Sequence, residues 1–364
     1  MQTILFLYNG ECFKLPPFLT ILDSLKEEFC IKVVSYETSE NLKKIKDIYN
    51  NSNVEFLNVL RETPSNGLST RIVRKVKHML GCKTKYQIEL EKKINDIHFD
   101  KLWVIHESTL KDVRSILANK QYIFSMYELN DTNKNLLHEI KESIQQAEIV
   151  IVPEYNRACI LRVWCNLPKT PLVVPNKPLL HPRKKNILTD KLQNKNLGKI
   201  ILYQGHIQPT RNLDVICEAV SSLSGYTLLL MGARSPYRDE LQRKYANVEV
   251  IDFVNPPEHL YITSHAYIGI VKYDFVVLNA IFCAPNKTYE YAGFGIPMIG
   301  NNIPGLKYSI GSYNAGECVD LDDVSEVINA IKRIDENYND YVKGANEFFD
   351  SVDIKSLLLK IVKN

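Results

Sequence analysis

APNKTYEYAGFGIPMI, residues 284–299, places a helix, a glycine-rich turn and a strand in succession. The helical pattern begins near Pro285, a residue tolerated in a first helical turn, and ends near Gly295. A short apolar strand follows Pro297. A helix that leads into a buried strand is one step of a βαβ unit, so this stretch predicts a parallel sheet.

The same alternation extends outward from this stretch along the whole chain. Helical patterns such as Phe18–Phe29 and Thr132–Gln146 lie between short apolar runs. In the first half, the runs that predict strands are Ile4–Tyr8, Lys32–Tyr36, Leu102–Ile105, Tyr122–Ser125 and Ile149–Val152. In the second half they are Lys199–Tyr203, Tyr226–Met231, Val248–Ile251, Ile268–Val271, Met298–Ile299 and Glu317–Val319. Two such series predict an α/β protein with two Rossmann-like domains.

The boundaries of these domains follow from composition. The chain has 364 residues, a length typical of two domains. A segment rich in proline and then in polar residues separates the two series. We therefore predict domains over residues 1–178 and 199–340, with a linker over 179–198. Residues 341–364 have a helical pattern, which either caps the second domain or crosses back to the first.

Two residues of the opening stretch carry chemistry. Free backbone N–H groups near Asn286 and Lys287 would face an anion, and Lys287 adds a full positive charge. Glu290 lies three residues further on, on roughly the same helix face, where a carboxylate can accept hydrogen bonds from ribose hydroxyls. The alternative is an ordinary helix with an exposed lysine and an acidic first turn.

A second candidate segment is IILYQGHIQPTRN, residues 200–212. A buried strand runs into Gly205, which allows a ligand to approach the backbone closely. Ligands of open α/β sheets bind beyond the carboxyl ends of the strands, so Arg211 is placed to contact a diphosphate. A tight turn followed by a solvated arginine is the alternative.

These residues resemble a known family. Residues 199–310 are similar to the donor-binding domain of GT-B glycosyltransferases, in particular glycosyltransferase family 4 of bacterial surface-polysaccharide pathways. The match is specific at PNKTYEY and GIP, residues 285–291 and 295–297, which correspond to the family's NKxxEY…GxPxI variant. Tyr203 and Gly205, with Arg211, resemble the family's phosphate-binding strand and loop.

The resemblance implies a fold and an activity. The fold is GT-B, in which two Rossmann-like domains face each other across a deep cleft, with the acceptor on the N-terminal side. The activity is a hexosyltransferase-type transfer from a nucleoside-diphosphate sugar to a saccharide or lipid-linked saccharide in surface glycan biosynthesis. Transfer is expected to be retaining and metal-independent, and the nucleotide sugar is a substrate, so no cofactor is implied.

The resemblance also assigns the donor site. Glu290 is expected to bind the ribose, and Arg211 and Lys287 to neutralise the diphosphate. The complete set of donor-binding residues implied is Gly10, Gly205, His206, Arg211, Asn286, Lys287 and Glu290. The chain departs from the family at Phe282, which replaces the first glutamate of a Glu-x7-Glu pattern, and at His206, which replaces an arginine.

Candidate acceptor-side residues follow two strands of the first domain. His106 comes directly after the run Leu102–Ile105, and Glu128 follows the next strand. Polar residues at the carboxyl end of a strand are site candidates, although an ordinary loop residue is equally compatible with the pattern. The resemblance makes His106 and Glu128 the expected catalytic residues, with Glu107 either a nearby alternative or a solvated side chain.

The single DxD sequence, Asp320-Leu321-Asp322, directly precedes a helical pattern. Such a motif can hold a metal-bound diphosphate. Aspartates in front of a helix more often cap it, so we interpret the motif as a cap and predict no metal site.

Composition limits the partners and the location. The net charge of +3 is too small to indicate a nucleic-acid partner. The apolar run Ile4–Tyr8 is too short for a signal peptide or a membrane span, which predicts a cytoplasmic protein. Leu68–Leu80 has one apolar and one basic face. That segment is either a core-packing helix or a peripheral contact with the inner face of the membrane.

The sequence is compatible with three functions. The leading one is a glycosyltransferase. A catalytically weak GT-B subunit that binds a sugar nucleotide or a partner protein is the second, motivated by Phe282. A GT-B sugar-nucleotide epimerase is the third, although the Asn-Lys-x-x-Glu run is not expected there.

Overall fold

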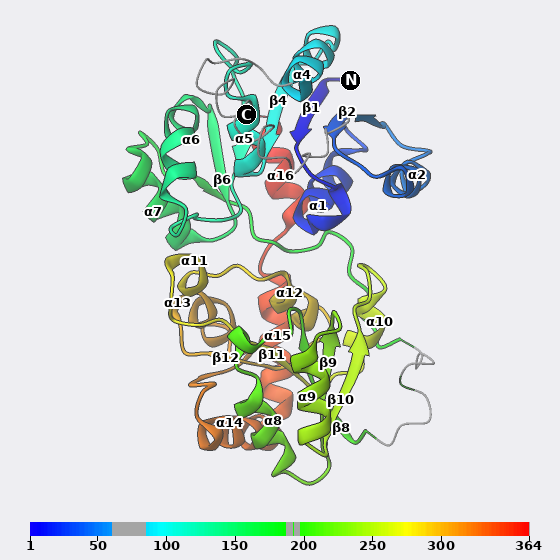
Figure 1. The fold of residues 1–364 in the computed structure, drawn as a ribbon, viewed down its shortest axis with the longest axis vertical. Helices are drawn as coiled ribbons and strands as arrows, with labels where there is room; N and C mark the ends of the chain where they lie inside the picture. The colour runs from blue at the N-terminus through cyan, green and yellow to red at the C-terminus, as the bar shows by residue number, and fades with distance from the viewer. Residues whose placement is uncertain (60–84, 187–191, 193–196, 364) are drawn as a thin grey trace, which may run out of the picture. The chain divides into compact units, whose positions relative to one another are not determined.

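The computed structural model describes residues 1–59, 85–186, 192 and 197–363, and these form two compact units. The first unit contains Met1–Val174 and Leu357–Asn364, so both ends of the chain belong to it (Figure 1). The second contains Pro175–Ser356. The segment predicted as a linker, 179–198, is thus grouped with the second unit. The amphipathic segment Leu68–Leu80 lies outside the described residues.

The first unit is built on a seven-stranded parallel sheet of order β3-β2-β1-β4-β5-β6-β7. Its strands are β1 (Thr3–Tyr8), β2 (Cys30–Ser35), β3 (Val54–Asn58), β4 (Lys101–Ile105), β5 (Ile123–Ser125), β6 (Ile149–Val152) and β7 (Leu172–Val173). Its helices are α1 (Pro16–Leu25), α2 (Ser39–Ile48), α4 (Lys85–Asp96), α5 (Glu107–Val113), α6 (Lys134–Gln146) and α7 (Tyr155–Cys165), with a 3₁₀ turn, η1 (Cys12–Lys14).

The second unit repeats this plan with a six-stranded parallel sheet of order β10-β9-β8-β11-β12-β13. The strands are β8 (Lys199–Gln204), β9 (Tyr226–Gly232), β10 (Val248–Asp252), β11 (Ile268–Val271), β12 (Met298–Asn301) and β13 (Gly316–Val319). The longer helices are α8 (Asp214–Ser221), α9 (Pro236–Lys244), α12 (Asn286–Ala292), α14 (Val324–Glu336) and α15 (Tyr338–Asp350). The shorter ones are η2 (Pro209–Arg211), α10 (His259–Thr263), α11 (Leu278–Ile281), α13 (Pro304–Leu306) and η3 (Lys307–Gly311).

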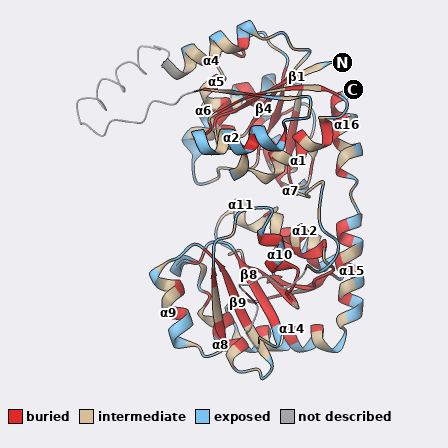
Figure 2. Cartoon of the chain, turned by 90° about the vertical axis from the view of Figure 1, so that its right-hand side faces the viewer, coloured by how far each residue is buried: buried red, intermediate tan, exposed pale blue. Residues whose placement is uncertain are grey.

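Both faces of the second sheet are buried, which explains why its strands read as continuous apolar runs. Ile201 and Tyr203 of β8 pack into one core with residues of α8 and α14. Ile200 and Leu202, which alternate with them, pack into another with residues of α12 and α15. Figure 2 shows the strands as the most buried elements of each unit. The predicted fold class, α/β with two parallel sheets, is confirmed.

The end of the chain differs from the sequence prediction. One helix was expected over residues 341–364, whereas the structure has α15 and a separate α16 (Ile354–Lys363). Asp353 separates them because its carboxylate accepts a hydrogen bond from the Ser356 backbone N–H at 3.1 Å, which starts a new helix. From Leu357 onward α16 belongs to the first unit. None of the described helices combines the length and apolar character needed to cross a bilayer.

The strand order of each sheet reverses at one point. In the first unit this point lies between β1 and β4, and in the second it lies between β8 and β11. In open α/β sheets, the connections from the two strands beside such a point run to opposite faces of the sheet, and ligands bind beyond the carboxyl ends of these strands. Candidate functional residues are therefore those that follow β1 and β4 in the first unit, and β8 and β11 in the second.

Candidate functional site

In the second unit, a positively charged group lies directly against the end of β8. Gly205 follows this strand with φ +141°, and a Cβ added there would lie 3.1 Å from Lys287 Nζ. Lys287 Nζ also donates to the Gln204 carbonyl oxygen at 2.8 Å. Glycine is favoured here because this φ is strained for a residue with a side chain, and an added Cβ would also press against the Lys287 ammonium.

Lys287 and Arg211 share an aromatic neighbour. The Arg211 guanidinium lies 5.4 Å from the centroid of the Tyr273 ring, and Lys287 Nζ lies 5.8 Å from it. Burial lowers the pKa of Lys287 to about 8, partly opposed by Glu290 and reinforced by Arg211. The positive charge of Arg211 thus disfavours the charged form of Lys287, and an anion bound at these two side chains would offset that repulsion.

Glu290 lies one helical turn beyond Lys287 on α12 and is fixed by two side chains. One carboxylate oxygen accepts from Gln204 Nε2, and the other lies 3.3 Å from His259 Nε2. Each carboxylate oxygen can accept more than one hydrogen bond, so capacity remains for ligand hydroxyls. The Glu290 carbonyl oxygen accepts from His181 Nε2 at 3.0 Å, which anchors the same turn of the helix.

Sequence reasoning did not select Gln204 or His259. Gln204 is a polar residue at the end of an apolar strand, and this position could have indicated a site residue. It is buried, and its Oε1 accepts from Thr263 Oγ1 at 2.8 Å. His259 is buried in the short helix α10, and nothing in its local sequence indicates that it faces Glu290.

The other predicted donor residues are His206 and Asn286 in the second unit and Gly10 in the first. His206 is exposed, and its carbonyl oxygen accepts from Tyr203 Oη at 2.8 Å. Asn286 begins α12, which has seven residues and is preceded by Pro285 without a side-chain cap. Gly10 follows β1 and therefore belongs to the first unit.

In the first unit, His106 follows β4 at the point of strand reversal and caps α5. Its φ of +76° is unusual for a residue with a side chain, and such strain is concentrated at functional positions. His106 Nδ1 accepts from the Ser108 backbone N–H at 3.3 Å. The ring lies 6.4 Å from that of Tyr8 at the end of β1.

Glu107 and Glu128 lie in opposite environments. Glu107 is only 1% exposed, so the interpretation of this residue as a solvated side chain is wrong. Its carboxylate accepts from the Tyr127 backbone N–H at 3.3 Å and from Asn130 Nδ2 at 3.1 Å. These bonds hold the segment after β5, where Glu128 is exposed.

The DxD sequence is not itself the helix cap. Asp323, the next residue, caps α14 by accepting from the Ser325 and Glu326 backbone N–H groups. Asp320 accepts from the Asp322 backbone N–H at 2.9 Å. Asp322 Oδ1 accepts from Lys272 Nζ at 2.8 Å.

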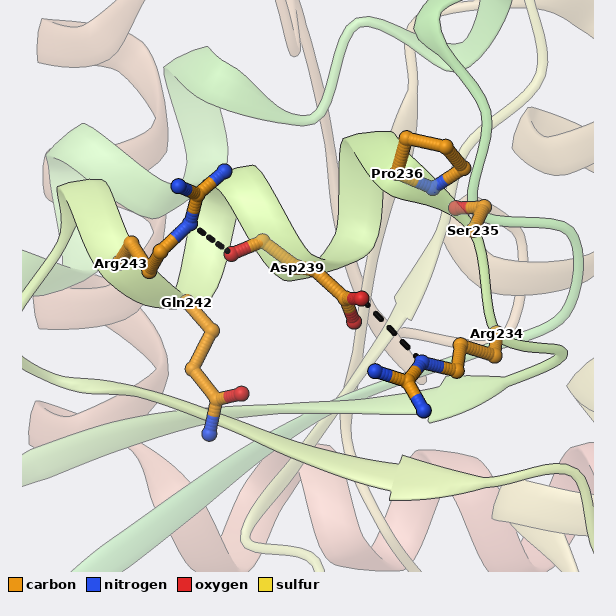
Figure 3. A pocket seen from close by; sticks show the side chains of 6 residues that line it. All are labelled: Arg234, Ser235, Pro236, Asp239, Gln242 and Arg243. Atoms are coloured by element: carbon orange, nitrogen blue, oxygen red, sulfur yellow. Dashed lines mark hydrogen bonds and ion pairs between the residues drawn. The ribbon is translucent and has the colours of Figure 1, made fainter.

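A shallow cavity of about 780 Å³ lies elsewhere, beside α9 (Figure 3). It is lined by Arg234, Ser235, Pro236, Asp239, Gln242 and Arg243. Asp239 holds both arginines, through its carboxylate to Arg234 and through its carbonyl oxygen to Arg243. The cavity contains none of the predicted site residues, and its cations are already engaged, so we do not assign the site there.

Part of the chain matches a known protein family. Residues 198–337 match the family model of the group 1 glycosyl transferases. No curated protein matches the chain in sequence.

Solved structures with the same fold cover essentially the whole chain. HepE from Anabaena, in complex with UDP-glucose, superposes with a TM-score of 0.71 at 11% identity and full coverage of both chains. Sucrose-phosphate synthase from Thermosynechococcus elongatus gives 0.65 at 15% identity, covering 100% of this chain and 98% of the other. UDP-GlcNAc 2-epimerase from Neisseria meningitidis, bound to UDP-GlcNAc, gives 0.64 at 13% identity with full coverage of both chains. These likenesses establish the GT-B fold.

Proposed function

We propose that this chain, a glycosyltransferase of the GT-B fold, binds a nucleoside-diphosphate sugar at the β8–β11 edge of its second unit. The sugar is transferred to a saccharide or lipid-linked saccharide acceptor in surface glycan biosynthesis. The observation that carries this proposal is that Lys287 lies against Gly205, shares the Tyr273 ring with Arg211 and stands one helical turn before Glu290.

The proposed roles follow from charge and position. Arg211 and Lys287 bind the diphosphate, whose negative charge increases as the glycosidic bond breaks. Glu290, held by Gln204 and His259, accepts hydrogen bonds from the ribose hydroxyls. Gly205 lets the phosphates approach the strand end, and Asn286 and His206 line the same edge. The UDP-glucose and UDP-GlcNAc complexes of the structural neighbours support a nucleotide-sugar donor.

We propose that transfer retains the anomeric configuration and needs neither metal nor cofactor. Two side-chain cations supply the charge that a metal ion supplies elsewhere. In a retaining transfer on one face of the sugar, the leaving phosphate can take the proton of the acceptor hydroxyl. His106 then orients the acceptor without acting as a formal base, with Glu128 as the second candidate.

The acceptor places the protein at the inner face of the membrane if it is lipid-linked. The basic face of Leu68–Leu80 is the proposed contact. Sedimentation with anionic vesicles tests it: wild type should bind more than a variant in which Arg71, Arg74 and Lys75 are neutralised. Equal binding of the two proteins would remove the membrane contact from the proposal.

The experiment that tests the donor site is a panel of nucleotide sugars followed by product analysis. A donor that binds should raise the melting temperature, because ligand binding to the folded state stabilises it by mass action. Arg211→Ala, Lys287→Ala and Glu290→Ala should each weaken that binding by roughly ten- to a hundredfold, the usual cost of losing a charged hydrogen-bond partner. The exposed pair Lys343 and Glu347 on α15 provides matched control substitutions.

The outcomes separate the candidate functions. Transfer or hydrolysis of the donor with retained configuration supports the proposal. Binding without any turnover indicates the catalytically weak subunit suggested by Phe282. Inversion at C2 of the donor sugar indicates an epimerase. Wild-type donor affinity in all three alanine variants would show that the site is misassigned.

A further inference from the structure

A fully buried lysine lies next to the proposed diphosphate site. β11 is buried along its whole length, and Lys272 follows it with a side chain that is 0% exposed. A buried ammonium group is costly unless a counter-charge and hydrogen bonds compensate it. Here Lys272 Nζ donates to Asp322 Oδ1 at 2.8 Å and lies 3.9 Å from Asp274 Oδ1. The DxD sequence therefore supplies the close counter-ion of this lysine.

The same Asp322 oxygen holds a second element. Asn212 Nδ2 donates to Asp322 Oδ1 at 3.0 Å. Asn212 has φ +41°, a conformation in which asparagine is favoured over most residues, and it directly follows Arg211. Asp322 thus restrains the backbone that carries the arginine.

Asp322 is also linked to Arg211 indirectly, through the segment that follows β11. Tyr273 follows Lys272, and its ring is the one over which the Arg211 guanidinium lies. The Tyr273 backbone N–H donates to Asn301 Oδ1 at 2.7 Å, which fixes the segment after β11 to β12. The Lys272–Asp322 ion pair adds a restraint on this segment from the loop before α14.

The loop that presents Asp322 is itself ordered. Asp320 accepts from the Asp322 backbone N–H, and the Asp320 N–H donates to Glu326 of α14 at 2.8 Å. Asp323 caps the helix. Every aspartate of this loop is therefore used by contacts within the second unit.

We propose that Asp322 is a positioning residue for the donor diphosphate, and that the DxD sequence serves this purpose instead of binding a metal. Through Asn212 it restrains the Arg211 backbone, and through Lys272 it restrains the Tyr273 platform. This inference rests on the proposed function only in assigning the diphosphate to Arg211.

Hydrogen–deuterium exchange of the apo protein tests the restraint without any ligand. Asp322→Asn removes the counter-charge of Lys272, and Asn212→Gly removes the amide while tolerating a positive φ. Both variants should exchange faster than wild type in peptides covering residues 205–213. Asp335→Asn is the matched control, because Asp335 also pairs with a lysine, Lys199, but at the first residue of β8. It should leave these peptides unchanged.

Calorimetric titration of UDP, GDP, TDP and ADP tests the consequence for binding. Asp322→Asn should lower the affinity for the diphosphate that binds on the order of tenfold, but have little further effect in an Arg211→Ala background, because coupled residues are not additive. A general loss of stability would instead lower affinity equally in both backgrounds.

Each result decides one point. Unchanged exchange in both Asp322→Asn and Asn212→Gly overturns the positioning role, as does full additivity with Arg211→Ala. If Asp322→Asn does not fold, Asn212→Gly decides, because Asn212 is exposed and the Lys272–Asp322 pair stays intact. Faster exchange together with normal binding by Arg211→Ala supports the restraint and rejects the donor-site assignment. A Mn²⁺-dependent affinity that Asp322→Asn abolishes would make Asp322 a metal ligand and overturn the inference.

Discussion

At the scale of single residues, the proposed contact of Lys287 with the diphosphate predicts a donor affinity that depends on pH. Burial lowers its pKa to about 8 from the ordinary lysine value of 10.5. Below pH 8 the ammonium is charged and attracts a diphosphate; above it, the charged fraction falls. We expect donor affinity to fall as pH rises through about 8, approaching tenfold per pH unit. Calorimetric titration between pH 7 and 9.5 measures this, and Lys287→Ala should bind weakly with a flatter profile.

The unliganded protein should show the opposite trend. Between about pH 8 and 10.5 the lysine is neutral in the folded state and still protonated in the unfolded chain. The unfolded state then binds more protons, so this group makes the free energy of unfolding rise with pH in that window. Urea denaturation of wild type and of Lys287→Ala at several pH values isolates the contribution of the residue.

For the donor prediction, an affinity that stays constant between pH 7 and 9.5 would mean that Lys287 does not contact the diphosphate.

His106 carries a different expectation, because we place it on the acceptor side. His106→Ala should lower kcat by about 10²–10⁴-fold, the usual range for positioning or acid–base groups, with a much smaller effect on donor binding. Steady-state kinetics with the true acceptor, alongside calorimetric donor titration, measures the two effects. His98→Ala is the control, since His98 is exposed and precedes β4. Near-normal turnover in His106→Ala would shift the role to Glu128.

The sequence could select those candidate residues whose signal is local. Arg211, Lys287 and Glu290 were selected because each lies within a short motif next to a strand. His259 and Lys272 were not found, because their significance comes from partners that are distant in sequence, Glu290 and Asp322. Asp322 was selected but interpreted as a cap, a role that Asp323 performs. A single sequence does not reveal such pairings.

At the scale of elements, close packing between β11 and α12 fixes the position of the helix that carries Lys287 and Glu290. Gly269 lies in the middle of β11, and a Cβ there would lie 2.5 Å from ring atoms of Tyr291. Tyr291 is fully buried, and its hydroxyl donates to the Leu202 carbonyl oxygen at 3.0 Å. The missing side chain of Gly269 therefore lets α12 approach the sheet closely enough to place Lys287 beside β8.

Gly269→Ala should consequently destabilise the second unit. Overpacking of a filled core costs typically about 1–3 kcal/mol. Urea denaturation measures the change in the free energy of unfolding, and Gly311→Ala is the control, because its added Cβ would meet only one atom, at 3.9 Å. Equal stability of the two variants would show that α12 can shift without cost.

The two strands that the sequence did not predict share a physical cause. β3 and β7 are sheet edges, and their residues are mostly half-buried, so they lack the continuous apolar runs that reveal the central strands. The break between α15 and α16 was missed because the helical pattern continues across it. By contrast, β8 and β11 could be predicted because strands buried on both faces appear as continuous apolar runs.

At the scale of the whole molecule, the two units share one topological feature. Both sheets reverse their strand order once, and the predicted residues gather at that point, with Gly10 and His106 after β1 and β4, and Gly205 after β8. Because ligands bind beyond the carboxyl ends at such a reversal, the alternation of strands and helices was enough to select these residues as candidates. The contacts between side chains within each site required the structure.

The protein should transfer sugar without a divalent metal ion. The leaving diphosphate needs positive charge, and Arg211 and Lys287 provide two cations on one edge of the second sheet. Asp322 is committed to Lys272 and Asn212, so the motif that most resembles a metal ligand already has its partners. Activity should therefore persist in excess EDTA, at a rate close to that of untreated enzyme. The measurement is the initial rate of sugar transfer before and after chelation, with Mg²⁺ and Mn²⁺ added back in parallel. Loss of the rate with EDTA and its recovery with either ion would require a metal-bound diphosphate, and the two cations would then be insufficient.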